Sequence, residues 1–238
     1  MAPINPNQHI SQKFDEEMEN LRNQVLKMGG FVEQQLRGAT KALRKLDVSE
    51  AETVSLNDKY VNTLEVSIDE ECTRILVRRQ PAASDLRMVV AVIKTITDLE
   101  RIGDEAKRIA KMAINISEQD GVFHNRYRGI IHLSDHVIQM VHEALDAFAR
   151  LDADAAFDVV RHDEKADIEY QSIMRQMLTY MMEDPRTISE SLDIMQAARA
   201  FERVGDHAMN IGEYVIYLVK GKDIRHIAIE DLERDILK

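Results

Sequence analysis

The sequence has few of the residues that build sheets or tight turns. Its 238 residues include no tryptophan, only nine glycines and four prolines, and 5 % aromatic residues. Alanine, leucine, isoleucine, methionine, glutamate, lysine and arginine dominate instead, which is the composition of helices. No segment has a convincing strand pattern, so we expect an all-α fold.

Cysteine is also scarce. The single residue, Cys72, excludes an internal disulfide and a metal site built from several thiolates, and it fits a reducing compartment. A lone cysteine of this kind is most often a small core residue.

Positive charge is in the minority, with 31 Lys and Arg against 42 Asp and Glu, for a formal net charge of −11. This charge repels nucleic acids and anionic lipid, so we expect no nucleic-acid role. The densest apolar run, Met88 to Ile93, is too short to span a bilayer. The N-terminus lacks a basic segment followed by an apolar one. We therefore expect a soluble, cytoplasmic protein without membrane insertion.

The sequence does contain an internal repeat. The segment Glu-Arg-Ile-Gly-Asp at residues 100–104 returns as Glu-Arg-Val-Gly-Asp at residues 202–206. Pro81 lies nineteen residues before the first copy and Pro185 seventeen before the second. A repeat of about 100 residues is too long for a solenoid unit and fits a duplicated bundle.

Apolar residues at helical spacing predict six long helices. Their expected ranges are about residues 9–46, 50–79, 84–117, 125–151, 153–182 and 187–219. Gly29 and Gly30 interrupt the first helix, so we expect either a bend or close packing against a neighbour there.

Turn and cap residues fall between these ranges. Asp47 to Ser49 indicates a turn and cap, Pro81 stops the second helix, Ser84 or its neighbours cap the third, and Gly221 ends the sixth.

Each half therefore consists of a long helix, a second helix, a turn containing proline and a third helix. Short connections favour antiparallel neighbours, so we expect two tandem, pseudo-symmetric three-helix bundles. The expected boundaries are residues 8–120 for the first repeat, 121–222 for the second, and 223–238 for a charged, partly ordered tail.

The repeated motif carries a pair of acids in each copy. Residues four apart share one face of a helix, so Glu100 pairs with Asp104 and Glu202 with Asp206. The apolar residues on the same faces are Val89, Ile93 and Ile96 in the first half and Met195, Ala198 and Met209 in the second. The carboxylates thus continue a core-facing stripe, where they need cations or hydrogen-bond donors as partners.

A facing helix supplies more oxygen ligands. Asp58 and Asn62 lie four apart in the first half, as do Asp163 and Asp167 in the second. Gly103 and Gly205 would let these helices approach the acidic pairs closely. Clusters of this kind suit Mg²⁺, Mn²⁺ or ferric iron. The alternative is structural, with the carboxylates paired to cations such as those of Arg101 and Arg203.

Other candidate ligands carry less information. His132 and His136 lie four apart without the acid of an HExxH motif, so we expect them on a solvated helix face. The twelve methionines are interpreted as core filling.

Four segments together resemble the PhoU family of phosphate-signalling regulators. They are the duplicated acidic motif and residues 28–35, 80–87 and 180–184, and the resemblance spans about residues 8–228. The resemblance implies two symmetric three-helix bundles, with iron or another metal on the acidic motifs. By position it implies Glu100 and Asp104 with Asp58, and Glu202 and Asp206 with Asp163 and Asp167. Asn62 stands where the pattern would have a carboxylate, and its amide offers a metal one neutral oxygen.

The resemblance also implies a function. Such a protein is a cytoplasmic negative regulator of the phosphate-starvation response that also restrains phosphate uptake. Its partners would be the nucleotide-binding subunit of the phosphate ABC transporter and the sensor histidine kinase. It would associate with the inner membrane through these partners. Because members of the family are often dimers, the resemblance also implies a homodimer.

The usual catalytic motifs, such as GxxxxGK[ST] and GxSxG, are missing, which favours an adaptor over an enzyme. Two alternatives are a carboxylate-bridged di-metal protein and a purely structural scaffold. Di-iron bundles use Glu-x-x-His motifs, and no histidine in this chain has glutamate three positions before it. The scaffold predicts that replacing Glu202 and Asp206 changes stability alone.

Overall fold

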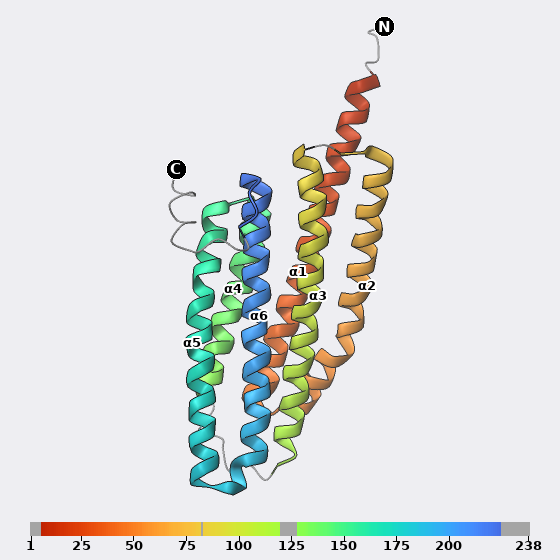
Figure 1. The fold of residues 1–238 in the computed structure, drawn as a ribbon. Coiled ribbons are helices and arrows are strands. Elements are labelled where there is room, and N and C mark those ends of the chain that lie inside the picture. Colours follow the sequence, from red (N-terminus) through yellow and green to blue (C-terminus); the bar gives the residue numbers. More distant parts are fainter. Residues whose placement is uncertain (1–5, 82, 120–127, 225–238) are drawn as a thin grey trace.

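The computed structural model describes residues 6–81, 83–119 and 128–224 (Figure 1). The elements are α1 (Pro6–Lys45), α2 (Val48–Arg79), α3 (Ala83–Ser117), α4 (Arg128–Arg150), α5 (Ala153–Glu183), the 3-10 turn η1 (Pro185–Thr187) and α6 (Ile188–Lys220). These three ranges contain no strand, so the prediction of an all-α fold is confirmed. Asn125, the expected start of the fourth helix, and residues 225–238 of the expected tail lie outside the described residues.

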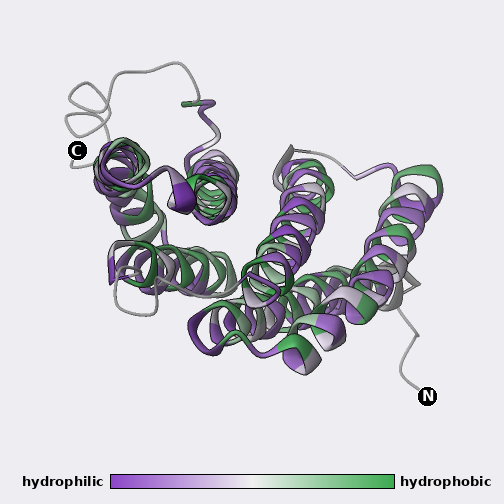
Figure 2. Ribbon diagram, turned by 90° about the horizontal axis from the view of Figure 1, so that it is seen from below, coloured by the Kyte–Doolittle hydropathy of each residue, from purple (hydrophilic) through white to green (hydrophobic). Residues whose placement is uncertain are grey.

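The helices form two three-helix bundles, α1 to α3 and α4 to α6, as predicted. The bundles lie side by side, with α3 against α6 and α1 against α4 (Figure 2). The two central helices, α3 and α6, run in opposite directions (Figure 1). The repeated acidic motifs thus lie on the two helices that join the bundles. None of the helices in the described ranges is long and apolar enough to cross a membrane.

One apolar core runs through both bundles. Phe148 and Phe201 are among its largest fully buried side chains. Cys72 is fully buried in this core, as expected, and burial raises the pKa of its thiol to about 12. Such a thiol stays protonated and unreactive at neutral pH. Met28 and Met140 also fill the core, whereas Met182 is 86 % exposed.

The predicted turns are present where the structure describes them. The side chain of Asp47 accepts a hydrogen bond from the Glu50 backbone N–H at 3.1 Å and caps α2. Gln80 has a left-handed backbone directly before Pro81, and Gly221, with a φ of 71°, ends α6. Ser84 lies inside α3, and the residue that precedes this helix lies outside the described ranges.

Gly29 packs closely against the second bundle. A Cβ atom built there would lie 2.3 Å from Cδ2 of Leu145 in α4, whereas one at Gly30 would meet nothing within 4 Å. The helix is continuous through both glycines. Of the two expected outcomes, close packing is therefore the one that occurs, and it lets α1 approach α4.

Candidate functional site

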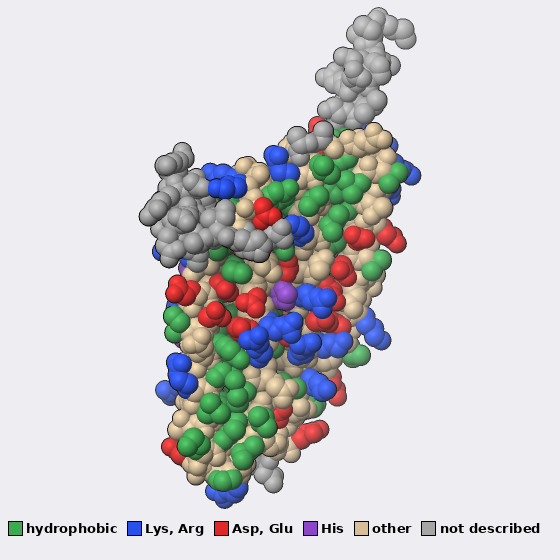
Figure 3. Space-filling model, in the orientation of Figure 1, with side chains coloured by type: hydrophobic (Ala, Val, Ile, Leu, Met, Phe, Trp, Pro, Cys, Tyr) green, Lys and Arg blue, Asp and Glu red, His purple; other side chains and the backbone are tan. Residues whose placement is uncertain are grey.

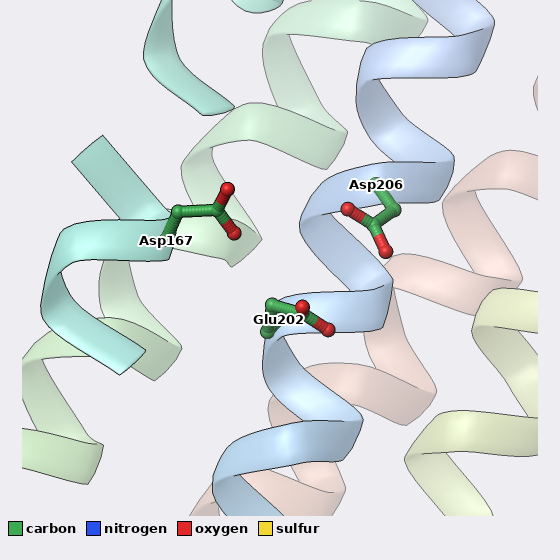
Figure 4. A group of neighbouring side chains, drawn as sticks. All are labelled: Asp167, Glu202 and Asp206. Atoms are coloured by element: carbon green, nitrogen blue, oxygen red, sulfur yellow. The ribbon is translucent and has the colours of Figure 1, made fainter. Parts of the chain in front are cut away.

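The second acidic cluster lies between α5 and α6. Asp167 projects from α5 toward α6, where Glu202 and Asp206 lie one turn apart (Figure 4). One oxygen of each of these three carboxylates lies within 4.8 Å of the other two. Among the residues that the structure describes, no other group of three His, Cys, Asp or Glu side chains converges in this way. The geometry offers three oxygen ligands to one cation.

A fourth carboxylate, that of Asp163, lies against this cluster. Its Oδ1 would be 3.4 Å from a Cβ atom at Gly205, an ordinary contact distance, so this carboxylate lies close to the acidic motif of α6. Burial raises the pKa of Asp163 to about 7, and the negative charges of Asp206 and Asp167 add to the shift. The carboxylates therefore repel one another at neutral pH, and a cation among them would relieve that repulsion.

The other two carboxylates on α6 are perturbed in the same direction. Burial, followed by the charge of Asp206, raises the pKa of Glu202, and burial followed by the charge of Asp167 raises the pKa of Asp206. Arg199 donates to Oε1 of Glu202 at 2.7 Å, but Oε2 of this glutamate is buried without a hydrogen-bond partner. A buried carboxylate oxygen without a donor is costly, so this atom is suited to a metal ion. The residues present therefore fit a hard cation.

The first acidic cluster is arranged differently. Lys107 of α3 donates to Oδ2 of Asp58 at 2.7 Å, so a cation of the chain already neutralises this carboxylate. Its Oδ1 is buried without a partner. Burial, followed by the charge of Asp104, raises the pKa of Glu100. In the first half, a cation of the chain thus takes the place that a metal would have at Asp58, which agrees in part with the structural alternative.

Glu65 also takes part in the first cluster, although it is not among the ligands predicted from the sequence. Asn62 is exposed, while Glu65 is partly buried one turn further along α2. Burial, followed by the charge of Asp69, raises the pKa of Glu65, and Asp104 adds to the shift. Glu65 lies seven residues after Asp58, which places both on the same face of the helix. That spacing was visible in the sequence.

The two arginines of the repeated motif do not act alike. Arg101 lies 3.6 Å from its neighbour Glu100. Arg203 instead crosses to the other bundle, where its Nη1 lies 3.0 Å from Oε1 of Glu105 on α3. The arginine of the second motif thus links the bundles, while Arg199 pairs with Glu202.

Gly103 is a point of close helix packing, as expected. A Cβ atom there would lie 3.3 Å from Cγ1 of Val61 on α2. This contact and that of Gly205 with Asp163 bring the facing helices next to the acidic motifs.

The prediction for the two histidines of α4 was half wrong. The side chain of His132 is 68 % exposed, but that of His136 is only 12 % exposed. The helix α5 covers His136, whose Nδ1 lies 3.5 Å from Oε2 of Glu169. Burial lowers the pKa of His136, so at neutral pH the ring is uncharged.

Comparisons with known proteins agree with this architecture. A family model described as the PhoU domain matches residues 25–113 and again residues 130–215. The structure is similar to the crystal structure of PhoU from Pseudomonas aeruginosa, with a TM-score of 0.85 and 50 % identity over 88 % of this chain and 100 % of that one. It is also similar to the phosphate transport system regulatory protein PhoU from Streptococcus pneumoniae, with a TM-score of 0.81 and 27 % identity over 88 % and 98 % of the two chains.

Sequence relatives cover nearly the whole chain. The phosphate-specific transport system accessory protein PhoU homolog of Pseudomonas aeruginosa is 50 % identical over 228 residues, which are 96 % of this chain and 94 % of the relative. The phosphate-specific transport system accessory protein PhoU of Escherichia coli (strain K12) is 46 % identical over 238 residues, covering 98 % and 96 %.

Proposed function

The chain belongs to the PhoU family, and on this premise we propose that it is an accessory protein of a phosphate-specific transport system that represses the phosphate-starvation response. The observation that carries the proposal is the identity of 46 to 50 % with proteins of that name over almost their full length. The role is one of protein contact and not of catalysis.

We propose two partners, the nucleotide-binding subunit of the phosphate ABC transporter and the sensor histidine kinase of the phosphate response. Both contacts would lie on the cytoplasmic side of the inner membrane. When phosphate is plentiful, the protein would restrain uptake and keep the kinase from activating starvation genes.

A patch of exposed apolar side chains supports a role in protein contact. The patch flanks the η1 turn and consists of Leu178 and Met182 at the end of α5 and Ile188 and Leu192 at the start of α6. The exposed fractions of these four residues range from 42 to 86 %. Apolar side chains gathered at one end of a molecule are typical of interaction surfaces. We call this patch the η1 end.

We propose that the second acidic cluster holds a cation such as iron, Mn²⁺ or Mg²⁺. Asp167, Glu202 and Asp206 would bind it, with Asp163 beside them. When bound, the ion would neutralise the cluster and hold α5 against α6. In the first half, Glu100 and Asp104 with Glu65 would form a weaker site, because Lys107 already engages Asp58.

A deletion strain tests the regulatory function. With ample phosphate, a reporter of phosphate-starvation genes should be constitutively expressed, and the intact chain should restore repression. Normal repression in the deletion strain would refute the regulatory role. If a variant with Glu202→Gln and Asp206→Asn keeps its fold but fails to restore repression, the cluster is more than a scaffold.

A further inference from the structure

A groove rich in positive charge lies between α3 and α6, although the chain as a whole is acidic. It has a volume of about 330 Å³, and its polar lining consists of Glu105, Arg108, Lys111, Gln196, Arg199 and Arg203. Figure 3 shows Lys and Arg side chains as a band over α3 and α6, with acidic side chains to either side. Four cations thus face a single lining carboxylate.

Acidic partners neutralise only part of this positive charge. Glu105 is only 2 % exposed, and both Arg108 and Arg203 pair with it. Arg199 pairs with Glu202 of the acidic cluster. Lys111 is exposed and has no ion pair or hydrogen bond within the described part of the chain. Counting both acidic partners, the groove keeps two excess positive charges.

The duplication does not explain this charge. Residues 102 positions apart correspond in the two halves, as Glu100 and Glu202 do. On that correspondence Arg108, Lys111 and Arg199 match Asn210, Glu213 and Thr97. Three of the four cations therefore have no cationic counterpart at the matching position of the other half.

We propose that this groove binds a phosphoryl anion, either inorganic phosphate or the phosphates of a nucleotide. Guanidinium forks and a lysine around one hollow are the donors that bind phosphate oxygens. The volume lies at the lower end of small-ligand sites. The proposal rests on these side chains and not on the proposed regulatory function.

Glu105 gives the groove a means of selection. A carboxylate has about four sites that accept hydrogen bonds. Arg108 contacts both oxygens of Glu105 and Arg203 contacts one of them, so these three contacts leave capacity for one more donor. Phosphate near neutral pH carries a proton that it can donate to this carboxylate, whereas sulfate carries none. The groove should therefore prefer phosphate to sulfate.

Calorimetric titration of the purified full chain, freed of metal and at low ionic strength, tests the proposal. The titrants are inorganic phosphate, adenosine triphosphate, sulfate and a short polyglutamate peptide. We expect at least one of the first two to bind, and the tighter of them identifies the source of the phosphoryl group. In a variant with Arg108→Gln and Lys111→Gln, binding should weaken by about tenfold or more.

A matched variant controls for net charge. Arg44→Gln with Lys45→Gln removes the same charges from another exposed groove, between α1 and α4, and should bind like the wild type. Unchanged circular dichroism would show that both variants fold. The proposal is overturned if neither phosphoryl ligand binds, if sulfate binds equally well, if only the peptide binds, or if the control variant is weakened to the same extent.

Discussion

Nδ1 of His207 lies 2.6 Å from Oδ1 of Asp98, and this contact joins α6 of the second bundle to α3 of the first. Asn210 donates to the same oxygen at 3.2 Å. Asp98 is only 7 % exposed, so its carboxylate depends on these two partners. The interface between the bundles is therefore fastened by specific polar contacts as well as by apolar packing.

This contact predicts a measurable coupling energy. In a double-mutant cycle of Asp98→Ala and His207→Ala, measured by the free energy of unfolding, the coupling energy should be about 1 to 2 kcal/mol. Each single change leaves a poorly solvated side chain without its hydrogen-bond partner. The exposed pair of Asp146 and Arg150 on α4 serves as the control and should give less than about 0.5 kcal/mol. Equal coupling in the two cycles would contradict the account.

The raised pKa of Asp163 predicts how stability depends on pH. In metal-free protein the folded state binds this proton up to about pH 7, whereas the unfolded chain releases it near the ordinary value of 3.8. The folded state thus holds more protons in this window, so the free energy of unfolding falls as the pH rises through it.

The variant Asp163→Asn removes this loss. At pH 8 and without metal it should be more stable than the wild type by roughly 1 to 2 kcal/mol, after allowance for solvent screening. The difference should shrink toward pH 4, as measured by urea unfolding at a series of pH values. A difference that does not vary with pH would show that the carboxyl is not perturbed.

The two acidic clusters should differ in metal content. Elemental analysis of protein purified without chelator should find a retained ion in the wild type. Glu202→Gln with Asp206→Asn should reduce that content by about tenfold, because it neutralises two of three converging ligands. Glu100→Gln with Asp104→Asn is the matched change in the first half and should reduce it less. Metal at trace level in the wild type would reject the site.

Replacing glycine by alanine should stabilise the protein where the helix surface is free and destabilise it where another helix packs closely. Gly30→Ala should stabilise the protein by about 0.5 to 1 kcal/mol, since a Cβ atom there meets nothing and alanine favours helix. Gly212→Ala should destabilise it by about 1 to 3 kcal/mol, since that Cβ atom would lie 2.9 Å from the backbone oxygen of Ala156. Thermal unfolding of both variants measures the change in stability relative to the wild type. A change of the same sign at both positions would contradict the packing of α5 on α6.

The sequence predicted what local spacing controls. The duplicated motif and the apolar stripes gave the six helices and the two bundles, and Asp47 and Gly221 marked helix ends correctly. Two features that follow from helical spacing were not predicted, namely the position of Glu65 on the face of Asp58 and the ion pair of Arg199 with Glu202, one turn further along α6. Arg199 and Glu202 obey the same short-spacing rule that identified the acidic pairs, and Glu65 lies two helical turns after Asp58.

The contacts between bundles could not be predicted in this way. Arg203 reaches Glu105, and His207 reaches Asp98, because α3 and α6 are antiparallel and have one particular offset along their axes. The internal repeat does not determine that offset, since the two ion pairs do not correspond to each other under the repeat. The burial of His136 was missed for a similar reason, because it depends on how α5 lies over α4.

Recovery of partners from membranes tests the proposed function most directly. The tagged full chain should recover the nucleotide-binding subunit of the phosphate ABC transporter from membranes prepared with phosphate. A variant with Leu178→Glu and Met182→Glu at the η1 end, checked for an intact fold, should recover less. Recovery of neither the transporter subunit nor the sensor kinase by the intact chain, with or without phosphate, would contradict the account.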